Sequence, residues 1–163
     1  MRSLILGMLA LSFVAPVQAQ TIDPQVTAPI TKFITSFNKG DMAGAAATHM
    51  SDADLVIIDE VPPFMWRGAD ALKTWAADLT AEAKKDGMTE QKVTLSRATR
   101  AEVNGAEAYV VVPAVYSFKQ GGVAKRESAH MTFAMKKGPS GWLIHGWTWS
   151  GPSAPKAAAA AKK

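Results

Sequence analysis

The chain has 163 residues, of which 48% are apolar and 20% charged, with no cysteine and a formal net charge of +4. This length suits one domain, and the apolar fraction is large enough to build a hydrophobic core. The composition excludes collagen-like, coiled-coil and wholly disordered chains. The absence of cysteine excludes disulfides, thiolate nucleophiles, iron–sulfur clusters and zinc sites made of cysteine.

The first 19 residues have the three parts of a secretory signal peptide. Arg2 supplies the positive charge, residues 4–14 form an apolar run, and small residues follow up to Ala19. The run is too short to span a bilayer, which needs ~20 apolar residues. We therefore expect cleavage after Ala19, export to the periplasm or the medium, and no membrane span in the mature protein.

The end of the chain, residues 151–163, combines Gly, Pro and Ser with an alanine run flanked by lysines. It has no apolar face to bury, so we expect a disordered Ala/Lys tail that follows a folded domain over residues 20–150. Part of the positive charge lies in this tail. The remaining charge is too small to indicate a nucleic-acid partner.

Three stretches predict helices. Residues 26–37 carry an apolar stripe at helical spacing, and Pro29 within them favours a helix that starts near Thr27. Gly40 ends this helix, and Asp41 is suited to cap a short second one. Apolar residues at helical spacing over 72–83 predict the third helix.

Strand signals fall into two groups. Residues 54–60 and 64–66 are separated by two prolines and predict a short hairpin. Period-two patterns then predict four long strands in an antiparallel meander, over 89–100, 106–118, 123–135 and 142–149. Pro113 cannot donate to a sheet ladder, so we expect a bulge or bend there. The order indicates an α+β fold, in which an N-terminal helical layer packs on a strongly bent antiparallel sheet.

Several short segments punctuate these elements: Phe37-Asn38-Lys39-Gly40-Asp41, Ile58-Asp59-Glu60-Val61-Pro62-Pro63-Phe64, Trp66-Arg67-Gly68, Ala71, Ala108-Tyr109-Val110-Val111-Val112-Pro113, Gly141-Trp142-Leu143-Ile144 and Trp149-Ser150. In this order they resemble the nuclear-transport-factor-2-like superfamily and, within it, the SnoaL-like (polyketide-cyclase-like) branch. The resemblance covers nearly all of residues 22–150. It implies a cone-shaped fold with a pocket between helices and sheet, and commonly a homodimer. The superfamily holds isomerases, cyclases, dehydratases, binding domains and assembly domains, so the fold does not name a reaction.

Enzymes of this superfamily generally use an acid or base inside the cone, helped by a tyrosine. Many relatives carry histidines on the last strand, where this sequence has Gly146 and Thr148. Asp59 is the candidate base, because an apolar site would raise the pKa of its carboxyl group. Strand alternation places Asp59 and Glu60 on opposite faces, so at most one enters the cone easily. The alternative for both is a solvated acid at the hairpin turn.

Two tyrosines are candidate hydrogen-bond donors to a ligand carbonyl. Tyr109 and Tyr116 lie seven residues apart on one predicted strand, and so on opposite faces unless a bulge at Pro113 shifts the register. Tyr116 is the catalytic candidate beside Asp59, and Tyr109 is a candidate for the pocket wall. The alternative for each is a place on the sheet surface or at a dimer interface.

Four more residues are candidates for the pocket wall: Trp66, Trp75, His130 and Thr148. The alternative for the tryptophans is the core or an interface, and for His130 a half-buried place in the sheet. The three histidines are scattered, which predicts no metal site, and no nucleotide, phosphate-loop or catalytic-triad motif predicts a cofactor.

Three hypotheses follow for the function. The leading one is a periplasmic, dimeric cone domain that binds a small, mostly apolar molecule without catalysis. The second is an isomerase- or cyclase-type enzyme with Asp59 as base and Tyr116 or Tyr109 as donor. The third is an interaction module in which the exposed sheet face and the tryptophans pair with another chain.

Overall fold

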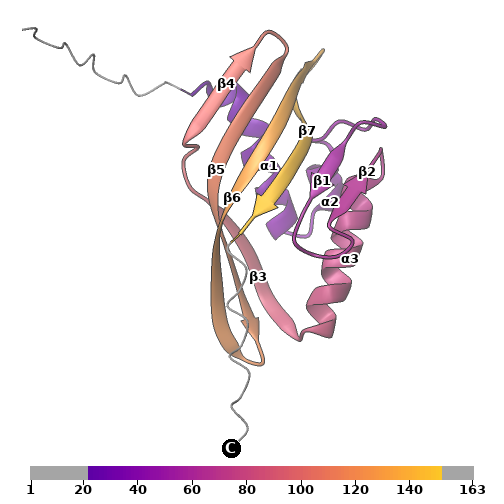
Figure 1. The fold of residues 1–163 in the computed structure, drawn as a ribbon, viewed down its shortest axis with the longest axis vertical. Coiled ribbons are helices and arrows are strands. Elements are labelled where there is room, and N and C mark those ends of the chain that lie inside the picture. Colours follow the sequence, from indigo (N-terminus) through magenta and orange to yellow (C-terminus); the bar gives the residue numbers. More distant parts are fainter. Residues whose placement is uncertain (1–21, 152–163) are drawn as a thin grey trace, which may run out of the picture.

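The computed structural model describes residues 22–151 (Figure 1). The elements are α1 (Pro24–Asn38), α2 (Met42–Ala46), β1 (Val56–Ile58), β2 (Met65–Arg67), α3 (Ala71–Lys85), β3 (Met88–Leu95), β4 (Arg100–Asn104), β5 (Glu107–Gln120), β6 (Val123–Gly138) and β7 (Gly141–Ser150). The expected signal peptide and the expected tail from residue 152 onward lie outside the described residues. Within residues 22–151, no helix combines the length and apolar character that crossing a bilayer requires.

The strands form one seven-stranded sheet in the order β2-β1-β7-β6-β5-β3, with β4 also paired to β5. The α+β cone fold is confirmed. Two details of the expected sheet are wrong: the first long strand is split into β3 and β4, and the β1–β7 pair is parallel, which makes the sheet mixed. The parallel approach depends on Gly146, where an added Cβ would lie 2.9 Å from the Val56 carbonyl oxygen.

The bulge expected at Pro113 is absent from β5 itself, which pairs with β6 in one unbroken register over its whole length. The irregularity lies in the opposite neighbour. β3 ends at Leu95, opposite Ala114, and β4 begins at Arg100, opposite Val111. Proline has no N–H to offer that side. The ladder is therefore interrupted in the partner strand, and β5 keeps its alternation.

Helix α1 starts at Pro24 rather than near Thr27. The Asp23 side chain caps it by accepting a hydrogen bond from the Gln25 N–H at 2.8 Å, and proline is well suited to the first helical position. Pro29 consequently lies inside the helix, where it cannot donate to the Gln25 carbonyl. The cap and the buried apolar stripe together outweigh that lost bond.

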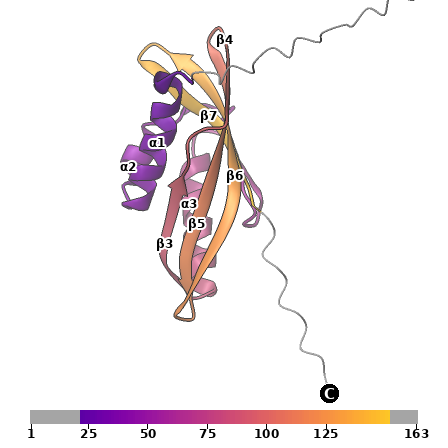
Figure 2. The ribbon, with the colours of Figure 1, turned by 90° about the vertical axis from the view of Figure 1, so that its left-hand side faces the viewer.

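The second helix is capped as expected: the Asp41 side chain accepts from the Gly44 N–H at 2.8 Å. Helix α1 lies against one face of the sheet and α2 packs on α1 on the same side, as Figure 2 shows, while α3 contacts β3. The core lies between them and includes the fully buried side chains Phe33, Phe133 and Ile144. The helical layer thus covers the inner face of the sheet only in part.

Candidate functional site

A cavity of about 360 Å³ remains between α1, α3, the turn after β1 and the inner face of the sheet. Its walls are mainly aromatic and aliphatic, and include Phe33, Phe37, Trp75, Val93, Trp147 and Trp149. Four acids and three other polar side chains complete the lining: Asp59, Glu60, Asp86, Glu127, Tyr116, Gln120 and Lys125. The interior of the cone is therefore hollow at this end, and the hollow is of a size that suits a small ligand.

Asp59 lies in the cavity wall, where it is held by two hydrogen bonds. Its carboxylate accepts from the Trp75 indole N–H at 2.7 Å and from the Glu60 backbone N–H at 2.7 Å. Burial raises the pKa of Asp59, and the Glu127 charge adds to this, while the two hydrogen bonds act in the opposite direction. The candidate base is thus oriented, and its proton affinity is increased.

Glu60 also lines the cavity, so the expectation that only one of the two neighbouring acids enters the cone is wrong. Strand β1 ends at Ile58, and the Asp59 N–H donates to the Phe64 carbonyl at 3.2 Å as the chain turns. Alternation between faces holds only within a strand, so it does not apply beyond Ile58.

Glu127 is a site residue that was not anticipated. The Trp149 indole N–H lies 3.0 Å from a carboxylate oxygen of Glu127 and 3.2 Å from one of Glu60, so the two acids share one donor. Burial, the contact with Glu127 and the charges of Glu127 and Asp59 raise the pKa of Glu60 to about 7. Glu60, with Glu127 beside it, therefore takes up a proton in the neutral range.

A sequence signal for Glu127 did exist. The Gly121-Gly122 turn pairs Gln120 with Val123, and counting back along both strands places Tyr116 opposite Glu127. Because directly paired residues of antiparallel strands share a face, Tyr116 and Glu127 had to lie together.

Tyr116 lies on the inner face and in the cavity. Its O–H donates to the Gln91 side-chain carbonyl, and its ring stacks on Phe118 with centroids 4.9 Å apart. Burial and the charges of Glu127 and Asp59 raise the pKa of Tyr116 to about 12. The phenol therefore stays protonated and can donate to a ligand when it releases Gln91.

Three of the proposed wall residues lie elsewhere. Tyr109 is on the outer face, where the Arg100 guanidinium lies 5.6 Å from its ring centre. His130 is exposed on the outer side of β6, and Thr148 faces outward between Ile58 and Thr132. Since β5 has no bulge, Tyr109 and Tyr116 stay on opposite faces, and the expectation that Tyr109, His130 and Thr148 line the pocket is wrong.

The two tryptophans divide between core and cavity. Trp66 is buried beneath α3, and its N–H donates to Asp78 at 2.8 Å, so it is a core residue rather than part of the cavity wall. Trp75 lines the cavity as expected, and its N–H holds Asp59. In the described part of the chain, no group of three or more His, Asp or Glu side chains is placed to hold a metal ion.

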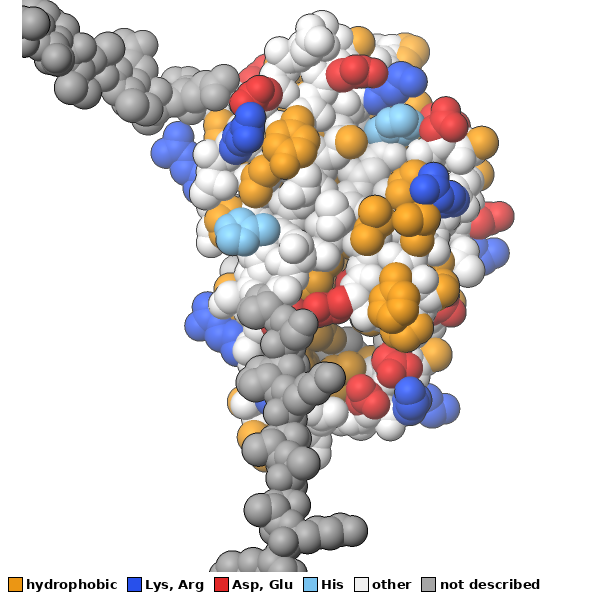
Figure 3. All heavy atoms as spheres, in the orientation of Figure 1, with side chains coloured by type: hydrophobic (Ala, Val, Ile, Leu, Met, Phe, Trp, Pro, Cys, Tyr) orange, Lys and Arg blue, Asp and Glu red, His pale blue; other side chains and the backbone are white. Residues whose placement is uncertain are grey.

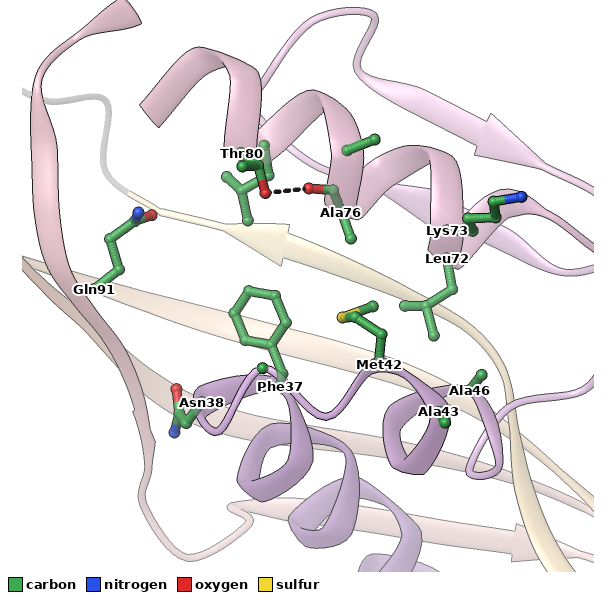
Figure 4. A pocket seen from close by; sticks show the side chains of 13 residues that line it. Phe37, Asn38, Met42, Ala43, Ala46, Leu72, Lys73, Ala76, Thr80 and Gln91 are labelled. Carbon is green, nitrogen blue, oxygen red and sulfur yellow. Dashed lines mark hydrogen bonds between the residues drawn. The ribbon is translucent and has the colours of Figure 1, made fainter. Parts of the chain in front are cut away.

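A second hollow, a groove of about 700 Å³, lies on the outside between α2 and α3 (Figure 4). Its floor is formed by short apolar side chains of both helices and by Met42. Thr80 at its rim donates to the Ala76 carbonyl at 2.7 Å. Phe37 and Leu79 line both this groove and the inner cavity, so these two side chains form the partition between them.

Comparison with known proteins identifies the family. The SnoaL-like domain family matches residues 26–154. The chain belongs to this family. The sequence matches no curated protein significantly.

Solved structures with the same fold include proteins of several kinds. A nuclear transport factor 2-like protein from Salmonella enterica serovar Typhimurium has a TM-score of 0.65 at 16% identity, over 83% of this chain and 94% of that one. A ketosteroid isomerase-like protein from Erwinia carotovora atroseptica has a TM-score of 0.61 at 18% identity, over 80% and 96%. ActVI-ORFA from Streptomyces coelicolor has a TM-score of 0.64 at 11% identity, over 80% and 95%. At these identities the likeness shows the fold alone.

Proposed function

We propose that this SnoaL-like protein is exported and binds a small, mostly apolar molecule in its cone. The cavity between α1, α3 and the inner sheet face carries this proposal, because it is walled by aromatic side chains and stays hollow. Burial of apolar ligand surface against such walls supplies the binding energy, at about 25 cal/mol per Å². Polar groups at one end would orient the ligand.

Thermal unfolding in the presence of lipophilic metabolites tests this binding. A ligand at 100 times its dissociation constant stabilises the folded protein by about 2.7 kcal/mol, which raises Tm by several degrees. Val93→Phe narrows the cavity and should abolish the shift, whereas Val103→Phe, on the exposed surface of β4, should leave it unchanged. If no metabolite raises the Tm of the parent protein, the binding proposal is wrong.

The second candidate function is acid–base catalysis of the isomerase or cyclase type. It is supported by a carboxylate of raised pKa, Asp59, and a protonated phenol, Tyr116, in the same cavity. Asp59 would remove a proton beside a ligand carbonyl, and Tyr116 would donate a hydrogen bond to the oxygen as negative charge develops. The name of the ketosteroid isomerase-like protein agrees with such chemistry without assigning it here.

Proton exchange of a simple ketone tests the catalytic candidate. The acidic C–H protons of 2-tetralone should exchange into deuterated water faster with the protein than in buffer, as followed by NMR. Asp59→Asn should remove about 100-fold or more of this acceleration, and Tyr116→Phe about tenfold. Exchange no faster than in buffer leaves ligand binding as the proposed function.

The interaction hypothesis, including homodimer formation, is supported by one exposed patch. Ile58, Phe64 and Met65 of the β1–β2 hairpin are 41–56% exposed, and hydrophobic side chains gather over this hairpin on the right of Figure 3. Light scattering during size exclusion should give a dimer mass, and Phe64→Ser should lower it to the monomer. A parent protein of monomer mass contradicts the homodimer.

A further inference from the structure

We propose that the ligand of the cone is an organic cation, an amine with an aromatic or other apolar body, whose ammonium group lies between Glu60, Glu127 and Asp59. This inference rests on the proposed binding function and names the chemical class of its ligand. The cavity itself is the site, and the arrangement of its charged and aromatic side chains selects the ligand.

Among the described residues, Asp59, Glu60 and Glu127 have no cationic partner. Asp59, Glu60 and Glu127 make no ion pair within 4.0 Å to any described lysine, arginine or histidine. Lys125, the one basic residue among the described lining residues, instead donates to the side-chain carbonyl of Gln120. The cavity mouth therefore carries an excess of negative charge.

The hydrogen bonds of these acids are also incomplete. A carboxylate has about four acceptor positions. Glu60 and Glu127 share a single N–H, that of Trp149, and otherwise contact each other, so their carboxylates keep free acceptor positions. An ammonium group carries three donors and one positive charge, so it would satisfy both carboxylates at once.

The walls suit the apolar part of such a ligand. The indoles of Trp75, Trp147 and Trp149 and the phenol of Tyr116 present aromatic rings to the cavity, and cations are attracted to the faces of such rings. Trp147 is 3% exposed, and its indole N–H has no acceptor in the described part of the chain.

Protonation should compete with the amine. The groups that face the Glu60–Glu127 pair are Asp59 from the hairpin turn, Tyr116 from β5 and the Trp149 indole, with Asp86 and Lys125 in the same lining. The pKa of Glu60 is about 7. Below that pH Glu60 is protonated and the site carries one negative charge less, so amine binding should weaken from pH 8 to pH 6.

Calorimetric titration of the full protein with three probes of one shape tests the inference. The probes are 2-phenylethylamine, the neutral 2-phenylethanol and the anionic phenylacetate. At pH 8 the amine should bind about tenfold or more tightly than the alcohol, and the anion should bind most weakly. Glu127→Gln and Glu60→Gln should each weaken amine binding about fivefold or more and leave alcohol binding within about twofold.

The control is Glu102→Gln, which removes the same charge on β4, where Glu102 pairs with Arg100. This variant should bind the amine like the parent protein, and thermal melts of all variants should confirm that they fold. If the alcohol binds as tightly as the amine, or if Glu127→Gln leaves amine binding unchanged, the cation inference is wrong while the binding function stands. If none of the three probes and no lipophilic metabolite binds, the cation inference and the proposed binding function are both wrong.

Discussion

The inner face of the sheet has a packed end and a hollow end, and one strand passes through both. Along β6, Phe133 and Met135 are buried away from the cavity, whereas Met131 and Glu127 on the same face line it. Where the two ends meet, Phe33 of α1 lies over Trp147, the register partner of Phe133, with ring centres 5.7 Å apart, and both rings also line the cavity. The difference lies in the helical cover and not in the strand pattern.

The ionisable groups of the two ends also differ in burial, and therefore in charge. His49 at the packed end is 6% exposed, and burial lowers its pKa to about 4. Its Nδ1 lies 3.0 Å from the Ala45 carbonyl, which can only accept, so the ring is neutral with its proton on Nδ1. At the hollow end, acids keep part of their contact with water and of their charge. Dense packing around His49 favours its neutral form, whereas the incomplete helical cover at the hollow end lets the acids there keep their charge.

Truncation of one phenylalanine at each end should give the largest difference. Phe133→Ala should lower the free energy of unfolding by about 3–5 kcal/mol, because a fully buried ring leaves a cavity that its neighbours cannot fill. Phe118→Ala, at the half-buried end of β5, should cost about 1 kcal/mol. Urea unfolding measures both, and equal losses would show that the two ends are packed alike.

The pH dependence of stability should separate the ends next. Because the folded-state pKa of His49 lies below that of the unfolded chain, its contribution is complete above pH 6.5 and falls by about 3 kcal/mol toward pH 4. His49→Gln should flatten this slope, and the exposed His130→Gln serves as the control. If the free energy of unfolding of His49→Gln still falls between pH 6.5 and pH 4 as in the parent protein, another group causes the pH dependence.

Glu60 should act in the opposite direction. A carboxyl group whose pKa is raised to about 7 destabilises the folded state as the pH rises from 4.5 through 7. Glu60→Gln should therefore stabilise the protein at pH 8 by about 1 kcal/mol, after allowance for solvent screening, and have no such effect at pH 4. Chemical unfolding at both values measures this, with Glu102→Gln as the control. Destabilisation at pH 8 would contradict repulsion in the acid pair.

The smallest expected effect distinguishes the two faces of one strand. Tyr109→Ser on the outer face of β5 should change the affinity for any cavity ligand by less than about twofold, whereas Tyr116→Ser should lower it about fivefold or more. Titration of both variants with the same ligand measures the difference. Loss of binding in Tyr109→Ser would mean that the outer face takes part.

The order of the helices and of most strands, the cap of α2 and the hairpin turns could be predicted from the sequence, because each depends on neighbours in the chain. Asp41 caps α2 as expected, and the Gly121-Gly122 turn joins β5 to β6. The site was predicted only in part. Asp59, Tyr116 and Trp75 line the cavity, but Trp66, Tyr109, His130 and Thr148 do not. The prediction for Tyr109 failed because it depended on a bulge at Pro113 that does not form. The prediction for Trp66 failed because its burial depends on packing against a distant element, α3.

The sequence by itself determined the period of each strand and helix, and with it the face on which each side chain lies. This follows because backbone geometry repeats every two or 3.6 residues regardless of what packs above it. The tertiary structure decided how far the helices extend over the sheet, and therefore which inward-facing residues became core and which became cavity wall. It also brought Glu127 beside Glu60, 67 positions apart in the chain and joined by one Trp149 N–H.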